Sequence, residues 1–306
     1  MRKPRENRVN RIRDLSPGIG AALATCVFGL ALICSAPHGN ASDFQSPRTA
    51  ALGGAGHAGP LLNDSIYLDP SYMAFLPTFA ISGNYAWANY SDNSYRFKIQ
   101  NASIQDGNPT DLFQAGIGYS RRDDGTLIHL GTAKQIITQR LSVGLGGKAY
   151  FPANNGFGAP PRTFDANFSA TFIASESLQL SLLADNLVDD STTQSYGFQR
   201  EIIVGSKFNY QKILILYVDP HLFTSLDSGK YGYEAGIEFP MFSDLFLRGG
   251  MFHNATIPTE TNQIRGNGYG LGFGWIAPKL SMDYGLSRSL YPSVGITQVV
   301  GFTAYM

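Results

Sequence analysis

The chain has 306 residues, with 23 basic and 23 acidic side chains and therefore no formal net charge. Only 15% of its residues are charged, well below the roughly 25% of ordinary soluble domains, whereas aromatic residues make up 12% and glycines number 34. Six of the basic residues but only two of the acidic ones lie in the first 41 residues, so the remainder carries 17 basic and 21 acidic side chains. This slightly acidic remainder has no basic stripe, which argues against a nucleic acid partner.

The N-terminus predicts a secretory signal peptide at residues 1–41. A basic start is followed by an apolar run at residues 19–34, and Gly39-Asn40-Ala41 fits the small-x-small rule for cleavage. A membrane anchor is the alternative interpretation of the apolar run. The basic start and the cleavage rule together favour an exported protein.

From residue 78 to 306 the chain repeats one unit, roughly ten residues of alternating apolar and polar or glycine character followed by a turn. In the clearest instance, Tyr269, Leu271 and Phe273 alternate with single glycines. Because strand side chains alternate between two faces, one face of such a strand is aromatic and the other is nearly bare. Residues 42–77 do not alternate and are rich in Gly, Ala and Pro, so we predict that they form an N-terminal plug, or hatch, segment.

Fourteen strands are predicted for residues 78–306. They begin near Thr78, Tyr95, Leu112, Leu127, Leu141, Thr163, Leu178, Glu201, Ile213, Tyr231, Leu245, Gly268, Leu280 and Ile296. No stretch after the signal approaches about 18 apolar residues, so transmembrane helices are excluded. A chain that crosses a bilayer with strands needs a closed barrel, since open sheet edges cannot be satisfied in lipid. We therefore predict an all-β fold, a transmembrane antiparallel up-and-down β-barrel of about 14 strands, and favour it over a soluble sandwich or propeller, whose strands are nearer about five or six residues.

The turns and loops support this topology and orient it. An even strand count puts both ends of the sheet on the periplasmic side of an outer-membrane barrel. Most connections expected on that side are short, whereas the opposite set includes the long stretches 152–162, 188–200 and 253–267. We therefore expect a protein of the outer membrane of a Gram-negative bacterium, with outer-membrane lipids and the barrel insertion machinery as partners.

Alternation assigns most charged side chains to the lumen, since a charge facing lipid near the midplane costs roughly 2–4 kcal/mol. The inward set is Arg96, Lys98, Lys148, Asp165, Asp185, Glu201, Lys207, Asp219, Glu234, Glu238, Arg248 and Asp283. A hairpin turning around Ser243 pairs Glu238 with Arg248, and the following turn places Asp283 opposite Gly272. Because its planar fork can serve two carboxylates, Arg248 can reach both across the glycines. We expect Glu238, Arg248 and Asp283 to form a structural ion cluster near the periplasmic end; a transport role is the alternative.

Residues with catalytic patterns are scarce outside the signal. The histidines there are His57, His129, His221 and His253, and neither an HExxH nor a GxSxG motif occurs. Both cysteines, Cys26 and Cys34, lie in the signal, so no disulfide framework or thiolate metal site is expected. We predict no enzyme, no metal and no cofactor.

Several short motifs occur in a fixed order along the chain. They are Arg48-Thr49-Ala50-Ala51-Leu52-Gly53-Gly54-Ala55, Asp64-Ser65, Leu68-Asp69-Pro70-Ser71, Ala184-Asp185-Asn186-Leu187, Gly236-Ile237-Glu238-Phe239, Leu247-Arg248-Gly249-Gly250-Met251 and Met282-Asp283-Tyr284-Gly285. In order and spacing they resemble the long-chain fatty acid transporter (FadL) superfamily of outer-membrane barrels, which includes PorV-like proteins. In that superfamily a basic residue leads a Gly-Gly-Ala turn in the hatch. The resemblance therefore assigns Arg48, Gly53, Gly54, Asp69 and Pro70 to a plug motif.

The resemblance implies fourteen strands, an N-terminal hatch and passive uptake of small hydrophobic, fatty-acid-like molecules. An apolar inward face with Ile213, Ile215 and Tyr217 could accept such a ligand, or it could pack against the plug. The alternative function is a PorV-like barrel that does not transport but anchors or escorts a secreted or surface protein. A general porin, with an open lumen, is the third hypothesis.

Overall fold

The computed structural model describes residues 46–90, 96–108, 111–122, 125–153, 161–224, 230–242, 244–258, 263–292 and 294–306. The predicted signal peptide at residues 1–41 lies outside the described residues, as do residues 42–45 of the predicted plug. Among the described residues, no helix has the length and apolar character needed to cross a membrane.

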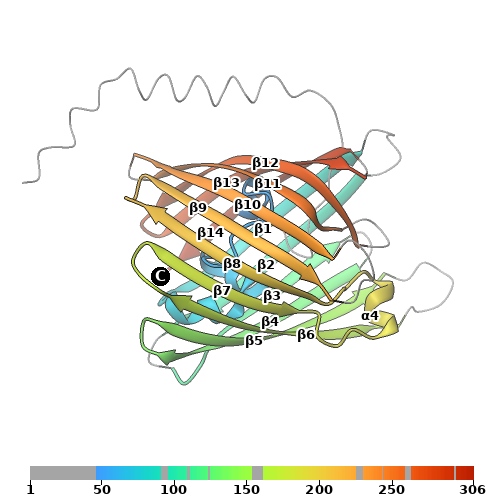
Figure 1. Cartoon of the computed structure of the whole chain (residues 1–306), viewed down its shortest axis with the longest axis horizontal. Helices are drawn as coiled ribbons and strands as arrows, with labels where there is room; N and C mark the ends of the chain where they lie inside the picture. Colours follow the sequence, from blue (N-terminus) through green and yellow to red (C-terminus); the bar gives the residue numbers. More distant parts are fainter. Residues whose placement is uncertain are drawn as a thin grey trace, which may run out of the picture. The chain divides into compact units, whose positions relative to one another are not determined.

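Fourteen strands occur within the described residues, and each follows an alternating segment of the sequence (Figure 1). They are β1 (Phe79–Tyr90), β2 (Arg96–Asp106), β3 (Gln114–Arg122), β4 (Gly125–Ile137), β5 (Leu141–Pro152), β6 (Thr163–Ile173), β7 (Leu178–Asp185), β8 (Glu201–Tyr210), β9 (Leu214–Phe223), β10 (Tyr231–Met241), β11 (Leu245–Pro258), β12 (Gln263–Ala277), β13 (Leu280–Tyr291) and β14 (Gly295–Tyr305). A short helix, α4 (Ser191–Ser195), lies in the connection between β7 and β8. Every strand but β12 begins within two residues of its predicted start. β12 begins at Gln263 instead of Gly268, because its ladder with β11 continues beyond a register shift between Phe252 and Ala255.

The strands form one closed barrel in which each strand pairs antiparallel with its neighbours along the chain. β1 and β14 close it, from Ala80 opposite Tyr305 to Tyr90 opposite Gly295. The backbone groups of the first and last strands therefore pair with each other, and the described sheet keeps no open edge. The predicted all-β barrel of fourteen antiparallel strands is confirmed.

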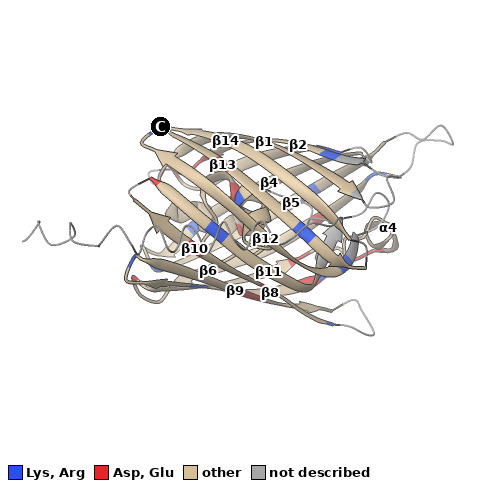
Figure 2. Cartoon of the chain, turned by 90° about the horizontal axis from the view of Figure 1, so that it is seen from above, with Lys and Arg blue, Asp and Glu red and all other residues tan. Residues whose placement is uncertain are grey.

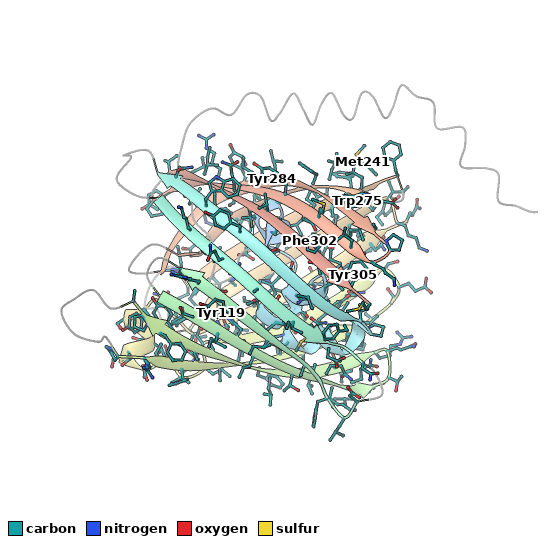
Figure 3. All side chains as sticks on the ribbon, turned by 180° about the vertical axis from the view of Figure 1, so that it is seen from behind. Tyr119, Met241, Trp275, Tyr284, Phe302 and Tyr305 are labelled. Carbon is teal, nitrogen blue, oxygen red and sulfur yellow. The ribbon has the colours of Figure 1, made fainter. Side chains whose placement is uncertain are left out.

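The outward face of the wall is apolar. Trp275, Phe302 and Tyr119 are 41%, 49% and 43% exposed, and Figure 3 shows them among the side chains that surround the barrel. Other exposed apolar side chains are Ile81, Ile117, Leu130, Leu145, Phe164, Phe168, Leu182, Val204, Val218 and Val300. Most of the strand length in Figure 2 carries neither basic nor acidic residues. An exposed apolar surface of this extent suits a bilayer and not water.

Lys98, predicted to face the lumen, lies on the other face of β2. Lys98 is exposed, and it pairs with Trp87 on β1. Because residues paired across a ladder share a face, both side chains lie on the outward face. The next residue, Ile99, points inward and is fully buried in a cluster with Ala50 and Val299. The prediction for Lys98 is wrong because the lumen is apolar at this position, where the wall packs against Ala50 from the N-terminal part of the chain.

The N-terminal segment, defined here as residues 46–77, consists of short helical turns. They are α2 (Pro47–Ala51), η1 (Leu62–Asp64), α3 (Ser65–Leu68) and η2 (Pro70–Phe75). Ser46 and Thr49 form a capping box at the start of α2, and Pro47 opens that helix. The side chain of Asp69 caps η2 in the same way, by accepting from the backbone N–H of Ser71.

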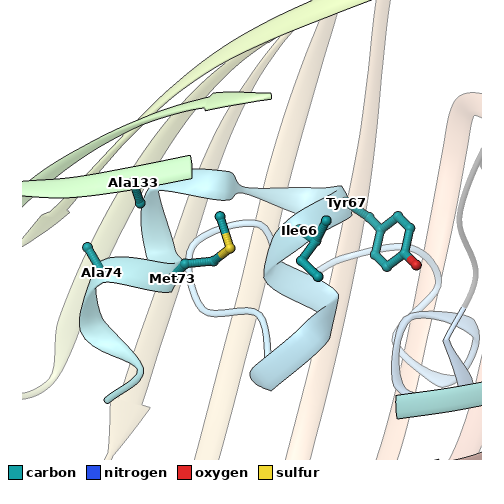
Figure 4. Close-up of a cluster of buried hydrophobic side chains, with 5 residues drawn as sticks. All are labelled: Ile66, Tyr67, Met73, Ala74 and Ala133. Atoms are coloured by element: carbon teal, nitrogen blue, oxygen red, sulfur yellow. The ribbon is translucent and has the colours of Figure 1, made fainter. Parts of the chain in front are cut away.

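The N-terminal segment contacts separate parts of the wall. α2 lies against β11, β12, β13 and β14, whereas η2 lies against β3, β4, β5 and β6. Figure 4 shows a cluster in which Ile66, Tyr67, Met73 and Ala74 of the segment pack with Ala133 of β4. These contacts place the segment inside the barrel. Its role as a plug that closes a passage stays a prediction.

Inward glycines let the wall approach α2 at backbone distance. A Cβ atom added to Gly250 would lie 2.0 Å from the carbonyl oxygen of Leu52, and one added to Gly270 would lie 2.0 Å from that of Ala50. Neither contact is sterically possible, and the opposing atoms are backbone. The bare face seen in the sequence is therefore the surface on which the N-terminal segment rests.

Candidate functional site

Arg248 on β11 joins two carboxylates inside the wall. Its Nε donates to Oε2 of Glu238 at 2.6 Å, and its Nη1 donates to Oδ1 of Asp283 at 2.5 Å. The Arg248 side chain is fully buried, and only 4% of Glu238 and 16% of Asp283 are exposed. Charge-assisted hydrogen bonds of this kind are stronger than neutral ones. The structure thus brings together the three residues of the predicted cluster, whose structural role stays a prediction.

The register around this cluster differs from the predicted one at a single step. Asp283 lies opposite Gly274 instead of Gly272, because the two-residue turn between β12 and β13 is at residues 278–279 and not at 277–278. A Cβ atom added to Gly274 would lie 2.0 Å from Oδ1 of Asp283 and 2.5 Å from Nη1 of Arg248. Gly274 therefore leaves the space that the ion pair occupies.

Arg48 connects the N-terminal segment to the same cluster. Its Nη2 donates to the Tyr217 hydroxyl at 2.8 Å, and its Nε lies 3.4 Å from Oε2 of Glu238. The Arg48 side chain is 3% exposed. Sequence reasoning had separated these residues, with Arg48 in the plug motif and Tyr217 among the ligand-lining candidates. The inward position of Tyr217 on its strand was the only signal that could have suggested the contact.

The predicted Gly-Gly turn is required by both conformation and space. Gly53 and Gly54 have φ of 67° and 93°, in the region that favours glycine. A Cβ atom on Gly53 would lie 2.6 Å from the backbone N of Met251, and one on Gly54 would lie 2.2 Å from Oε1 of Glu234. The turn therefore brings the segment against β10 and β11.

Asp69 and Pro70 of the predicted plug motif fix the other end of the segment. The carboxylate of Asp69 accepts from the hydroxyl of Ser71 at 2.6 Å and from that of Thr171 on β6 at 2.5 Å. Pro70 occupies the first position of η2, where its missing N–H carries no penalty. Because Thr171 belongs to the wall, Asp69 attaches η2 to the barrel.

A cavity of about 240 Å³ lies between the N-terminal segment and the strands β1, β12, β13 and β14. Leu61, Leu62 and Ile276 give it apolar surface, whereas Asp64 and Asp283 contribute carboxylates. Of the ion cluster, Asp283 alone borders the cavity. The cavity can hold a small molecule whose bulk is apolar.

None of the predicted ligand-lining residues borders this cavity. Ile213 lies in the turn between β8 and β9 and is 62% exposed. Ile215 and Tyr217 point inward and pack with Leu52 and Ala55 of the N-terminal segment. For these two residues the structure shows the packing alternative, and a ligand contact stays a prediction.

Asp64 in the N-terminal segment should make stability depend on pH. Burial raises the pKa of Asp64 to about 6, although Arg48 opposes the shift. Between its unfolded pKa of about 3.9 and the folded value, the folded protein holds a proton that the unfolded chain has lost. The stabilising contribution of Asp64 is therefore complete below the unfolded pKa and is lost as the pH rises towards about 6.

We expect the free energy of unfolding of Asp64→Asn to rise relative to that of the unsubstituted protein as the pH increases from about 4 to about 7. The expected difference is on the order of 3 kcal/mol, because the pKa of Asp64 is shifted by about two units. Urea unfolding in lipid vesicles at the two pH values measures this difference. Asp244→Asn in an exposed turn is the control and should show no such trend. A difference between Asp64→Asn and the unsubstituted protein that stays constant with pH would contradict the prediction.

Comparison with known proteins adds to this geometry. No family model and no curated protein matches the sequence. The crystal structure of the Pseudomonas putida toluene transporter TodX matches with a TM-score of 0.61 and 10% identity, over 85% of this chain and 98% of TodX. The deltaS2 mutant of TodX, described as a monoaromatic hydrocarbon channel, matches with a TM-score of 0.58 and 11% identity, over 86% and 99%. This chain has the fold of TodX. The FadL-like barrel expected from the sequence motifs is thereby confirmed as a fold.

Proposed function

We propose that the chain is an outer-membrane barrel for the passive uptake of small hydrophobic molecules. The observation that carries the proposal is the cavity of about 240 Å³ beside the N-terminal segment. It lies within a barrel that shares the fold of TodX, which is described as a toluene transporter and, in its mutant form, as a monoaromatic hydrocarbon channel, not as an enzyme. The cavity and the fold together support transport over catalysis.

The outer membrane is the location that the chain's features support. The outward face is apolar, and the strands pair into a closed barrel as lipid requires. The predicted signal peptide at residues 1–41 would direct the chain out of the cytoplasm. A Gram-negative outer membrane is where exported barrels of this kind insert.

The size of the cavity indicates the class of ligand. An apolar cavity of about 150 Å³ is large enough to bind benzene, whereas pockets for drug-sized ligands span about 300–1,000 Å³. At about 240 Å³, the cavity fits a molecule nearer in size to toluene than to a long-chain fatty acid. The two carboxylates Asp64 and Asp283 outnumber the one cation Arg48 in the lining, so we propose a neutral hydrocarbon-like molecule and not an anionic one.

Passage beyond the cavity requires the N-terminal segment to move. Arg48 and Asp69 hold the segment to the wall through Tyr217, Glu238 and Thr171. A ligand in the cavity would touch one of these residues, Arg48, and could disturb its contacts with Tyr217 and Glu238. We propose that ligand binding weakens these contacts and so opens the path.

Thr303→Trp tests the proposal by filling the cavity from β14. The adjacent Phe302→Trp is the control, because Phe302 is 49% exposed on the outward face. We expect labelled toluene to bind the purified barrel in detergent. Thr303→Trp should bind toluene at least about tenfold more weakly, a loss of about 1.4 kcal/mol in binding free energy, whereas Phe302→Trp should bind it normally. A labelled fatty acid measured in parallel distinguishes the two ligand classes.

Two outcomes would overturn the uptake proposal. One is toluene and fatty acid binding no greater than in empty detergent micelles. The other is an empty barrel that is purified from native membranes with a protein partner in fixed stoichiometry, which would favour the anchoring or escorting function.

A further inference from the structure

Five titratable side chains gather where the N-terminal segment meets β8, β9 and β10. His57 comes from the segment, Glu201 from β8, Asp219 and His221 from β9, and Glu234 from β10. One ring nitrogen of each histidine and one carboxylate oxygen of Glu234 all lie within 4.8 Å of one another. The side chains of His57, His221 and Glu234 are only 7%, 4% and 8% exposed. This group is distinct from the Arg248 cluster and has no part in the uptake proposal.

Two atoms at the centre of this group lack hydrogen-bond partners. They are Nε2 of His221 and Oε2 of Glu234, which face each other at 3.4 Å without forming a hydrogen bond. Buried polar atoms without a partner are rare, and each costs free energy. Ligand atoms around a tetrahedral Zn²⁺ lie about 3.3–3.5 Å apart at ordinary bond lengths. The separation of these two atoms therefore suits a shared metal ion.

Each histidine is also held by a second carboxylate. Nδ1 of His221 lies 3.0 Å from Oε2 of Glu201, and Nδ1 of His57 lies 2.9 Å from Oδ2 of Asp219. Metal-binding histidines almost always donate their other ring N–H to a carboxylate or carbonyl, which fixes the ring and raises its basicity. For His221 this arrangement leaves Nε2 aimed at Glu234. Glu201 is thus placed as a supporting residue of a metal site, whereas Asp219 contacts the same ring nitrogen of His57 that lies 3.9 Å from Oε2 of Glu234.

The charge of the five side chains also favours a bound cation. Within the described residues, the ion pairs of Glu201, Asp219 and Glu234 are all with His57 and His221. With neutral histidines the three carboxylates carry three negative charges, and Arg265, which interacts electrostatically with Glu201, offsets one of them. A divalent cation would balance the other two. Imidazole nitrogens with a carboxylate oxygen are a donor set that suits zinc among divalent ions.

We propose that His57, His221 and Glu234 bind a divalent zinc-type cation that joins the N-terminal segment to the barrel wall. Because the ligands come from the segment and from two strands, the metal would hold residue 57 against the wall. Removal of the metal would therefore loosen the segment without unfolding the barrel. The three ligands are far apart in the sequence and form no local motif, which is why the sequence predicted no metal.

The test uses the untagged, full mature chain, purified in detergent, stripped with EDTA and dialysed. Zinc titration by calorimetry and elemental analysis should give one ion per chain. We expect His57→Gln, His221→Gln and Glu234→Gln each to weaken zinc binding at least about tenfold, and Glu201→Gln to weaken it about 10- to 100-fold. His129→Gln is the control, because His129 is an equally buried histidine of β4 outside the group; it should bind zinc normally.

A second measurement needs no substitution. Zinc added to the stripped protein should slow proteolysis of the N-terminal segment, and EDTA should restore the faster cleavage. The proposal is overturned if the folded, unsubstituted chain binds no stoichiometric zinc. It is also overturned if the folded ligand variants bind zinc as tightly as His129→Gln.

Discussion

Replacing Arg248 with methionine is expected to lower the free energy of unfolding by about 3–5 kcal/mol, the usual loss when one partner of a buried ion pair is removed. The substitution leaves the carboxylates of Glu238 and Asp283 without their 2.6 Å and 2.5 Å donors. Arg48 remains near Glu238, so Asp283 becomes the main uncompensated charge. Denaturant unfolding in lipid vesicles measures the loss.

Two further variants separate charge from packing in this cluster. Arg248→Lys keeps the charge, but a single ammonium lacks the planar fork, so we expect it to recover only part of the stability. The triple variant Glu238→Gln, Arg248→Met and Asp283→Asn removes the buried charges together, so we expect it to be more stable than Arg248→Met alone. If Arg248→Met lowers the free energy of unfolding by less than about 1 kcal/mol, the Arg248 ion pairs contribute no more than ordinary surface ion pairs, and the prediction is refuted.

Gly250→Val is expected to release the N-terminal segment while leaving the barrel intact. Any Cβ atom at this position would lie 2.0 Å from the carbonyl oxygen of Leu52 and 2.7 Å from the backbone N of Gly53. The ladder of β11 tolerates a β-branched residue, so the clash falls on the segment. We expect proteolysis of residues 46–77 to become about tenfold faster or more, which requires a loss of only about 1.4 kcal/mol, and the conductance of the lumen to rise.

The adjacent Gly249→Val is the matched control. A Cβ atom on Gly249 would lie 3.5 Å and 3.8 Å from side-chain atoms of Leu271 and Ile237 and 3.9 Å from the backbone oxygen of Gly270. These are ordinary van der Waals contacts, so the segment should stay docked. A Gly250→Val barrel that remains closed and as resistant to protease as Gly249→Val would show that the segment does not depend on this close approach.

The fold was predictable because one physical rule governs most of the chain. In a barrel wall, each strand meets lipid on one face and the lumen on the other, so the period of two persists over every strand. Together with a count across the hairpin predicted to turn around Ser243, the rule places Glu238 opposite Arg248 with both side chains inward. It failed where the lumen is itself apolar, since Ile99 took the inward position that had been assigned to Lys98.

The site was less predictable, because its contacts depend on docking and not on local pattern. Arg48 meets Tyr217 across 169 positions of sequence, and His57 meets Asp219 across 162. No periodicity links residues at such distances. The two-residue error in placing Asp283 shows a second limit, since the position of a turn sets the register of every residue after it.

The position of the N-terminal segment also constrains how the protein assembles. Residues 46–77 precede all fourteen strands, yet α2 rests on β11 to β14, the last four to be synthesised. The surface on which α2 packs therefore does not exist until the chain is complete. Contacts between residues so far apart in sequence form late and slowly. α2 must therefore remain undocked until the final strands arrive, so barrel closure and docking of α2 become one coupled last step of folding.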